Sequence, residues 1–287
     1  MMIEAFREID HDAKAVADCQ TWLIQQKQVQ NWHSTTATAD AVHSLLMGGT
    51  KMSGENQPDP IGTASPLLSA NHSIEITMGG EMLHPPQTEA GTGFFEMRFA
   101  GPAVKPALGD ISLTKTGTGM SWASVHWQYL EDIAKITNHH STGLSLEKSL
   151  FVRRVTPQGR VLEPLAGKAK VGDELVTRLV LRNDRAMEFV HLKDSRGSGT
   201  EPLNVLSGYR TQDGLACYEV TRDTASHFFL DRLPPGTHVF ETSVRIQHAG
   251  LYQTGSAEIR CLYAPEFSAH SGSVPIEVEQ RCPGLGS

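Results

Sequence analysis

Two short patterns in this chain bring together a serine and lysines, the residue types that perform acyl transfer in one class of hydrolase. Ser145 and Lys148 form a Ser-x-x-Lys, and Lys115-Thr116-Gly117 forms a Lys-Thr-Gly. Where both patterns work together, the serine attacks a carbonyl and the lysine helps to activate it. Here the Lys-Thr-Gly comes first, and the Ser-x-x-Lys lies in a strand-rich stretch. We therefore expect neither pattern to be catalytic.

Another serine lies in a pattern close to a nucleophile elbow. Gly119-Met-Ser121-Trp-Ala123 has the required small residues. The elbow exposes its serine at a strand-turn-helix within a parallel sheet, whereas both flanks here are typical of strands. A hydrolase that uses Ser145 or Ser121 stays as one hypothesis, to be tested with a fluorophosphonate probe or a labelled penicillin, but we expect the chain to be no enzyme.

Histidines are the next candidates, as metal ligands. His139-His140 are adjacent and His126 lies upstream. Zinc sites use three or four ligands, and neighbouring residues of an extended backbone point in opposite directions. We expect a solvated loop over 137–143, with no metal and no cofactor.

Four cysteines do not form a metal-binding or redox motif. Cys19, Cys217, Cys261 and Cys282 include no Cys-x-x-Cys, which excludes a zinc ribbon or a thioredoxin-type motif. A disulfide between Cys217 and Cys261 on neighbouring strands is conceivable. Buried free thiols are the alternative, and the sequence leaves both open.

The composition is that of a folded chain. It has 287 residues, of which 20% are charged and 39% hydrophobic, and a domain usually takes ~100–200 residues. The net charge of −7 and the lack of a basic patch argue against nucleic acid as a partner. No stretch approaches the ~20 apolar residues of a membrane span, and the first residues lack the features of a secretory signal.

Helical spacing covers residues 1 to about 50. Ala13, Val16 and Leu23 fall on one face, and Ser34-Thr35-Thr36 offers hydroxyl groups that can cap a further helix. Gly48-Gly49 suits the end of that helix. Trp22 and Trp32 bracket the connection between the helices. We expect them to pack between helices, although an aromatic-lined pocket is an alternative.

Beyond a linker at 51–70, rich in proline and glycine, the hydrophobic pattern has the period of two that is typical of strands. Two sets are expected on either side of a break at 137–143. They cover residues 74–78, 95–99, 111–115 and 121–129, then 146–155, 175–182, 188–194, 217–221, 227–233, 238–248, 256–263 and 274–278. Strands at this spacing favour antiparallel β-sandwich domains, preceded by the helical segment.

Two surface features carry functional alternatives. Residues 263–271 could dock another domain, but we favour a loop that crosses between sheets with Phe267 buried. Phe228 and Phe229 are neighbours in an expected strand, so one ring should face the core and the other should face outward. The outward ring is a candidate for a domain interface.

The run from Phe228 to Glu241 reads FFLDRLPPGTHVFE, and it is followed by Gln247-His-Ala-Gly250 and by Tyr263-Ala-Pro-Glu-Phe-Ser-Ala-His-Ser271. Together these stretches resemble the C-terminal domain of bacterial alpha-2-macroglobulins. Residues 32–41 resemble a late helix of that family's thioester-bearing helical domain. Residues 125–132 resemble the segment that leaves its CUB-like domain. The three similarities occur in the family's order along the chain.

This resemblance implies three parts. Residues 1–52 would be the last helices of an α/α toroid, 56–140 part of a CUB-like β domain, and 144–287 a C-terminal macroglobulin-type sandwich. The family traps proteases, in many members through a Cys-x-Glu-Gln thioester, and this chain has no such motif because Cys19 is followed by Gln-Thr-Trp. The chain would be a scaffolding fragment whose partners are upstream domains and, for the parent, proteases. Its expected location is the periplasm, outer membrane or cell surface. The alternative is a free-standing β-sandwich binding or adhesion module with a helical cap.

Overall fold

The computed structural model describes residues 2–29, 32, 34–46, 73–84, 95–117, 123–166 and 168–280. The chain forms two compact units. One combines Met1–Lys27 with Trp32–Ser124, and the other combines Gln28–Asn31 with Val125–Ser287. The three finer boundaries implied by the sequence, 1–52, 56–140 and 144–287, stay a prediction because this division is coarser.

Three helices open the chain, α1 (Met2–Glu8), α2 (Ala13–Val29) and α3 (Thr35–Leu46). Ser34 caps α3 as expected, because its Oγ accepts a hydrogen bond of 3.0 Å from the amide of Ala37. Among the helix side chains that the structure describes, the buried apolar ones are Ile3, Val16 and Ala41. Gln20 of α2 is also buried, and its Nε2 donates to the carbonyl of Ser44 at 3.3 Å. The predicted helix end at Gly48-Gly49 and the linker at 51–70 lie outside the described residues.

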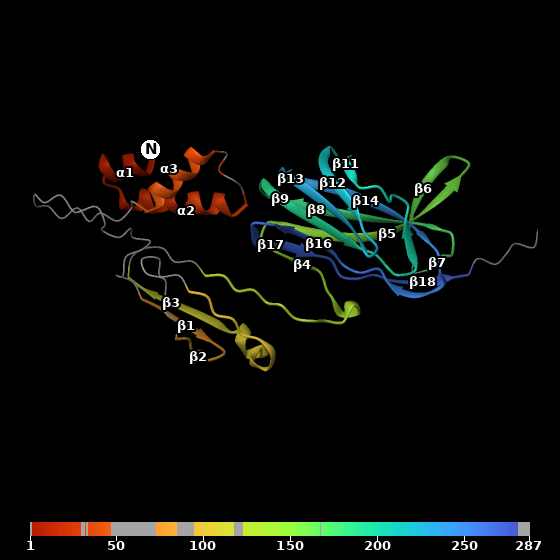
Figure 1. Cartoon of the computed structure of the whole chain (residues 1–287), viewed down its shortest axis with the longest axis horizontal. Helices are drawn as coiled ribbons and strands as arrows, with labels where there is room; N and C mark the ends of the chain where they lie inside the picture. The colour runs from red at the N-terminus through yellow and green to blue at the C-terminus, as the bar shows by residue number, and fades with distance from the viewer. Residues whose placement is uncertain are drawn as a thin grey trace, which may run out of the picture. The chain divides into compact units, whose positions relative to one another are not determined.

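The first unit also contains a small antiparallel sheet in the order β2-β1-β3 (Figure 1). Its strands are β1 (Ser73–Met78), β2 (Glu81–Met82) and β3 (Ile111–Thr116). Short 3-10 turns lie at Gly101–Ala103 and Pro106–Gly109. None of this sheet's described side chains is buried. A sheet this small is stable on its own only when one of its faces packs against other residues. We therefore do not expect these three strands to be stable in isolation.

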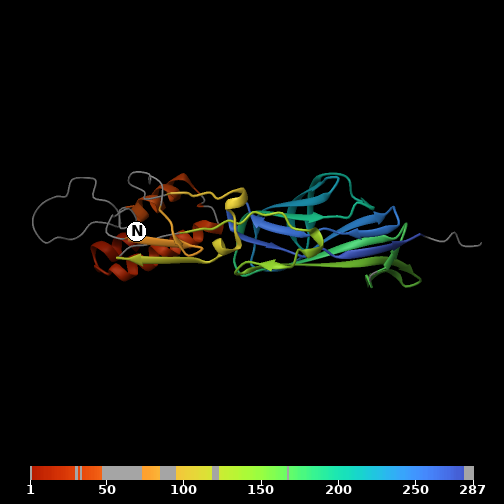
Figure 2. The ribbon, with the colours of Figure 1, turned by 90° about the horizontal axis from the view of Figure 1, so that it is seen from below.

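The second unit is a β-sandwich (Figures 1 and 2). A 3-10 turn at Ile133–Lys135 precedes it. Its strands are β4 (His139–His140), β5 (Leu144–Thr156), β6 (Gly159–Pro164), β7 (Lys168–Lys170), β8 (Glu174–Asn183), β9 (Met187–Ser195), β10 (Thr200–Pro202), β11 (Gly208–Gln212), β12 (Leu215–Thr221), β13 (Ala225–Leu233), β14 (Gly236–Ile246), β15 (Gly250–Gln253), β16 (Ala257–Cys261), β17 (Ala264–His270) and β18 (Pro275–Glu279).

These strands form three sheets. A five-stranded sheet has the order β10-β14-β8-β5-β6, a seven-stranded sheet has the order β11-β12-β13-β9-β16-β17-β4, and a smaller sheet has the order β15-β18-β7. All neighbouring strands are antiparallel except β18 and β7. The predicted fold class, antiparallel β-sandwich with N-terminal helices, is confirmed.

The core of the sandwich consists of two hydrophobic clusters. The first lies between the five- and seven-stranded sheets and includes Leu146, Leu181, Phe228 and Phe240. The second lies between the five-stranded and the small sheet and includes Leu150, Val152, Ile246, Ile276 and Val278. Burying one such side chain stabilises the fold by about 1.5–3 kcal/mol. The long strand β5 contributes to both clusters, so it spans the whole core.

Four sequence-based expectations about local structure are wrong. Residues 95–99 and the described part of 121–129 form no strand, and residues 137–143 and 263–271, expected as loops, contain β4 and β17. A strand needs a neighbour to satisfy its backbone N–H and C=O groups. Alternation in the sequence does not supply that neighbour. All eight strands predicted beyond residue 143 are present.

Candidate functional site

A lysine and an aspartate occupy inward positions of two strands of the sandwich. On β5 the buried residues alternate as Leu144, Leu146, Leu150 and Val152, and Lys148 has the same parity. On β9, Asp194 follows Leu192 in the same way. Successive side chains of a strand point to opposite faces, so both charged groups are directed into the core.

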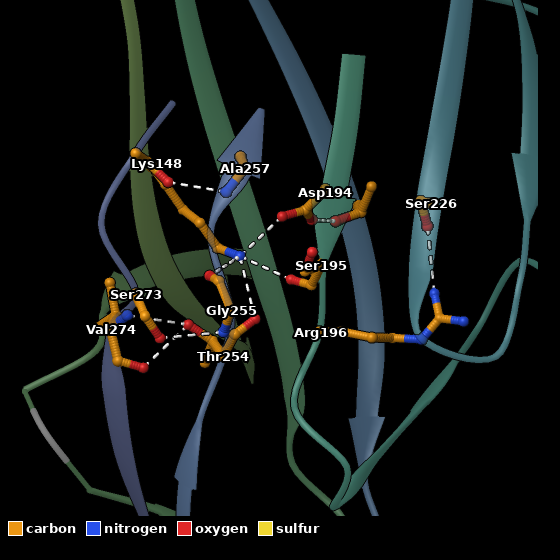
Figure 3. A network of polar contacts seen from close by, with 12 residues as sticks. Lys148, Asp194, Ser195, Arg196, Ser226, Thr254, Gly255, Ala257, Ser273 and Val274 are labelled. Carbon is orange, nitrogen blue, oxygen red and sulfur yellow. Dashed lines mark hydrogen bonds and ion pairs between the residues drawn. The ribbon is translucent and has the colours of Figure 1, made fainter. Parts of the chain in front are cut away.

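The two groups form a buried ion pair (Figure 3). Lys148 Nζ donates to Asp194 Oδ1 at 2.8 Å, and the two side chains are 1% and 4% exposed. The same nitrogen donates to the carbonyl oxygens of Ser195 at 2.8 Å and Gly255 at 3.0 Å. The other carboxylate oxygen of Asp194 accepts from the hydroxyl of Thr242 at 2.8 Å. All three ammonium hydrogens therefore have an acceptor, as a buried charge requires.

The ion pair and its hydrogen bonds connect the five-stranded sheet, the seven-stranded sheet and the link between β15 and β16. Lys148 and Thr242 belong to the five-stranded sheet, and Asp194 and Ser195 belong to the seven-stranded sheet. Gly255 lies in the link between β15 of the small sheet and β16 of the seven-stranded sheet. On β5, Lys148 stands between residues of the first core cluster and residues of the second. The network thus fixes where the sheets meet.

This arrangement favours structure and not catalysis. An ammonium nitrogen with three hydrogens has no lone pair for nucleophilic attack or for accepting a proton. Ser145 has the opposite parity on β5, so its side chain points away from Lys148. The Ser-x-x-Lys therefore does not form a nucleophile and base. Ser121 of the elbow-like pattern lies outside the described residues, and Lys115 and Thr116 lie in β3.

A second cluster lies on the outer face of the seven-stranded sheet. His191 of β9 and His227 of β13 share a hydrogen bond of 2.9 Å between Nε2 and Nδ1, and their rings are coplanar to 3°. Phe229 stacks on His191 with ring centroids 4.7 Å apart. Burial lowers the pKa of His191, and His227 and Arg260 lower it further. Burial also lowers the pKa of His227, with Lys193 as the next cause.

These lowered pKa values predict a loss of stability in mild acid. In the unfolded chain both histidines titrate near 6.5. As the pH falls through that value, the unfolded state binds protons before the folded state, so folding becomes less favourable. We expect the urea midpoint of the sandwich to fall as the pH decreases from about 7 to about 5. The double variant His191→Gln/His227→Gln should flatten this decrease.

The matched control for this experiment is His126→Gln, whose side chain is exposed in an extended segment. This control should keep the pH dependence of the parent chain. An unchanged pH dependence in the double variant would show that His191 and His227 do not cause the loss of stability in mild acid.

The remaining histidine candidates do not form a metal centre. His139 lies in the edge strand β4, where its ring stacks on His270 with centroids 5.5 Å apart. His140 Nδ1 accepts a hydrogen bond of 3.4 Å from the amide of Leu146. Across the part of the chain that the structure describes, no three potential ligands gather.

Cys217 and Cys261 are free thiols, so the disulfide considered from the sequence is not formed. Their strands, β12 and β16, are not neighbours because β13 and β9 lie between them. Three strand spacings of about 4.8 Å exceed the ~7 Å limit between the Cα atoms of a disulfide. The alternative of buried free thiols is confirmed for this pair. Cys282 lies outside the described residues.

Burial also predicts low reactivity for both thiols. It raises the pKa of Cys217, and it raises the pKa of Cys261 to about 11. Because the thiolate is the nucleophile, we expect iodoacetamide at neutral pH to modify Cys19, which is partly exposed, and to spare the two buried residues. Peptide mapping with and without guanidinium chloride measures this. Equal labelling of all three thiols in the native protein would disprove the prediction.

The aromatic predictions have mixed outcomes. Phe228 is fully buried and Phe229 is 39% exposed, which confirms the expected division between core and surface. Phe267 is partly buried against the first core cluster, although its segment is a strand and not a loop. Trp22 is 59% exposed, so the expectation that it packs between helices is wrong. Trp32 is partly buried, with Lys27 Nζ 5.8 Å from its ring centroid.

The sequence patterns did not predict the Lys148–Asp194 pair or the His191–His227 pair. A signal for the first existed, since a charged residue at an inward position of an alternating strand needs a partner. The histidines gave no such signal, because outward positions accept polar residues. Only the register of β9 with β13 brings the two rings together.

The described strands of the second unit form an antiparallel β-sandwich with a buried ion pair in its core. Residues 143–266, a little under half of the chain, match the family described as the bacterial alpha-2-macroglobulin MG10 domain. This confirms the expected resemblance to the C-terminal region of such proteins. No curated protein matches the chain.

Several solved bacterial alpha-2-macroglobulins are similar to the chain in structure. The trypsin-activated protein from Escherichia coli has a TM-score of 0.44 and 11% identity, over 97% of this chain and 18% of that chain. A Salmonella mutant, Y1175G, has a TM-score of 0.39 and 15% identity, over 96% and 16%. The Salmonella protein reacted with methylamine has a TM-score of 0.39 and 16% identity, over 58% and 10%. This chain therefore spans less than a fifth of the length of these proteins.

The helices α1, α2 and α3 are the described α-helices, and none of them combines the length and the hydrophobicity that crossing a membrane requires.

Proposed function

We propose that this chain is the C-terminal part of a bacterial alpha-2-macroglobulin-like endopeptidase inhibitor. The match of residues 143–266 to a domain of that family, in the best-packed part of the chain, carries the proposal. Protease trapping would belong to the parent protein. This part would be non-enzymatic, and it would hold the helical domain and couple it to the body of the inhibitor.

Exposed apolar side chains outside the sandwich support this role. In the three-stranded sheet of the first unit, β2-β1-β3, Ile74 and Leu113 are 40% and 52% exposed. In the extended segment after residue 122, Tyr129 is 75% and Leu130 103% exposed. Contiguous exposed apolar residues commonly mark an interaction surface. The family resemblance implies that upstream domains of the parent protein cover these exposed residues. The same holds for the CUB-like part and the toroid remnant as a whole.

The chain has no thioester motif of its own. None of its four cysteines begins a Cys-x-Glu-Gln. Gln20, next to Cys19, is buried in a hydrogen bond to Ser44. Covalent capture of a protease would therefore depend on residues outside this chain. The proposed location is the periplasm, outer membrane or cell surface, following the family.

Hydrogen exchange of the whole chain tests the proposal. We expect β5, β8, β9 and β13 to be protected, because they form the buried core. Helices α1 to α3 should exchange rapidly, since their proposed neighbours belong to another part of the parent. If these helices are as protected as the sandwich in a monomer, a free-standing binding or adhesion module with a helical cap becomes the better account.

Two further observations complete the test. Incubation of the chain with trypsin should give no covalent adduct, and a stoichiometric adduct would contradict the proposal. The coding sequence upstream should continue in frame through a helical repeat region. A stop codon and a ribosome-binding site just upstream would favour the binding module.

A further inference from the structure

The two outer faces of the sandwich differ in their chemistry. On the five-stranded sheet, charged side chains pair with one another, each at 2.7 Å, as Arg153–Glu174, Arg178–Glu241 and Arg182–Glu147. The charges of this face are paired with one another, so the face needs no binding partner in water. The seven-stranded sheet presents aromatic rings and imidazoles instead.

The rings form a row across four adjacent strands, which we call the ring row: Tyr209 of β11, Tyr218 of β12, Phe229 of β13 and His191 of β9. The register pairs each with the next, so all lie on one face. Their exposure is 82% for Tyr209, 38% for Tyr218 and 39% for Phe229. Exposed aromatic rings that lie side by side on a folded domain are typical of a binding site.

Cations lie at one end of the ring row. Arg260 of β16 is opposite His191, and Lys193 is opposite His227. Neither cation has an ion pair within the described residues, although Glu258 lies opposite Lys193. Because Phe229 and His191 stack with their planes 9° apart, they cover part of each other's faces and leave their edges outward. The edges of aromatic rings are electropositive.

The chain as a whole carries a net charge of −7, so this local excess of positive charge is unusual for it. A positive patch is complementary to a negative partner. A divalent metal is disfavoured here, since the two imidazole nitrogens face each other in a hydrogen bond and cations surround them.

We propose that the ring row, with Lys193 and Arg260, binds an acidic polypeptide segment of a partner. Carboxylates of the segment pair with the two cations, and its apolar groups pack on Phe229 and Tyr218. This inference does not rest on the proposed function, because it needs no upstream domain.

The hydrogen-bonded histidines make this binding depend on pH. At neutral pH the lowered pKa values keep the pair uncharged. Protonation in mild acid adds positive charge, while the carboxylates of the partner stay ionised. The charged groups around the pair are Lys193 of β9, Arg260 and Glu258 of β16, Arg222 beyond β12 and Arg196 beyond β9. All but Glu258 are cations, so added positive charge makes an anionic partner more favourable.

Fluorescence anisotropy with the full chain tests the proposal. The probe is a labelled peptide that alternates glutamate with leucine, and the control probe has glutamine in place of glutamate. We expect saturable binding of the acidic peptide only, weakened by salt. Lys193→Gln and Arg260→Gln should each weaken it by about twofold to fivefold. Phe229→Ala should weaken it by about tenfold.

Two comparisons make the test specific. The control Arg182→Gln removes a cation from the opposite face and should leave the affinity unchanged. Lowering the pH below the ordinary histidine value of 6.5 until the pair is protonated should tighten binding to the parent chain, but not to His191→Gln/His227→Gln.

Several results would overturn the proposal. These are an absence of saturable binding, equal binding of both peptides, or the same loss in Arg182→Gln as in Arg260→Gln. Self-association of the chain that Phe229→Ala abolishes would identify a second copy as the occupant. Binding of a neutral oligosaccharide at these rings would identify a sugar. Hydrogen exchange of α1 to α3 is not affected by any of these outcomes, so the two proposals fail separately.

Discussion

Replacing Lys148 by methionine should lower the free energy of unfolding of the sandwich by about 3–5 kcal/mol. The variant leaves the Asp194 carboxylate buried without its counter-ion, and it also leaves the carbonyls of Ser195 and Gly255 without their donor. Removing one partner of a buried pair is costly because the other charge stays out of water. Urea unfolding followed by circular dichroism measures the loss.

Two controls separate this effect from that of any lost lysine. Lys168→Met removes an ion pair to Glu279 whose side chains are 60% and 48% exposed. It should cost far less than Lys148→Met, because water already solvates both groups of this exposed pair. The double variant Lys148→Met/Asp194→Leu removes both charges and should recover part of the loss. Recovery stays incomplete, because Thr242 and the two carbonyls still lack partners. Equal losses of unfolding free energy in Lys148→Met and Lys168→Met would show that the buried pair stabilises the sandwich no more than an exposed pair does.

The elements of the sandwich could be predicted because burial on one face leaves a pattern in the sequence. On β8, for example, the buried Leu179 and Leu181 alternate with the more exposed Arg178, Val180 and Arg182. The pairing of strands left no such pattern, and this is why Cys217 and Cys261 could be imagined as neighbours. Residues 95–99 show the converse error, since they alternate without a partner strand among the described residues.

The candidate sites could be predicted only in part, for the same reason. Lys148 and Asp194 are 46 residues apart in sequence, and only the packing of β5 against β9 brings them together. The sequence does mark each as a charged residue at an inward position. The family resemblance pointed to the part of the chain that matches the MG10 family but not to these contacts, because it rests on the stretch from Phe228 to Ser271 and not on β5. These contacts depend on how the strands pair and pack, and that is decided by the whole fold.

The second large effect is expected at Gly255, where the backbone approaches the ion pair. Its φ is +74°, and a Cβ there would lie 2.6 Å from the Cβ of Ser195. Gly255→Ala therefore combines backbone strain with a clash that displaces the carbonyl bound to Lys148, and we expect a loss of about 2–4 kcal/mol.

Gly214 is the matched control for this prediction. Its φ is +76°, and a Cβ added at this residue would meet no atom within 4 Å. Gly214→Ala should cost only the strain of the left-handed conformation, about 1 kcal/mol. The difference between the two variants in urea unfolding isolates the close approach at Ser195. Because that approach holds the Gly255 carbonyl against Lys148, combining Gly255→Ala with Lys148→Met should cost less than the sum of the two single losses. Simple additivity would mean that the glycine and the ion pair stabilise the sandwich independently.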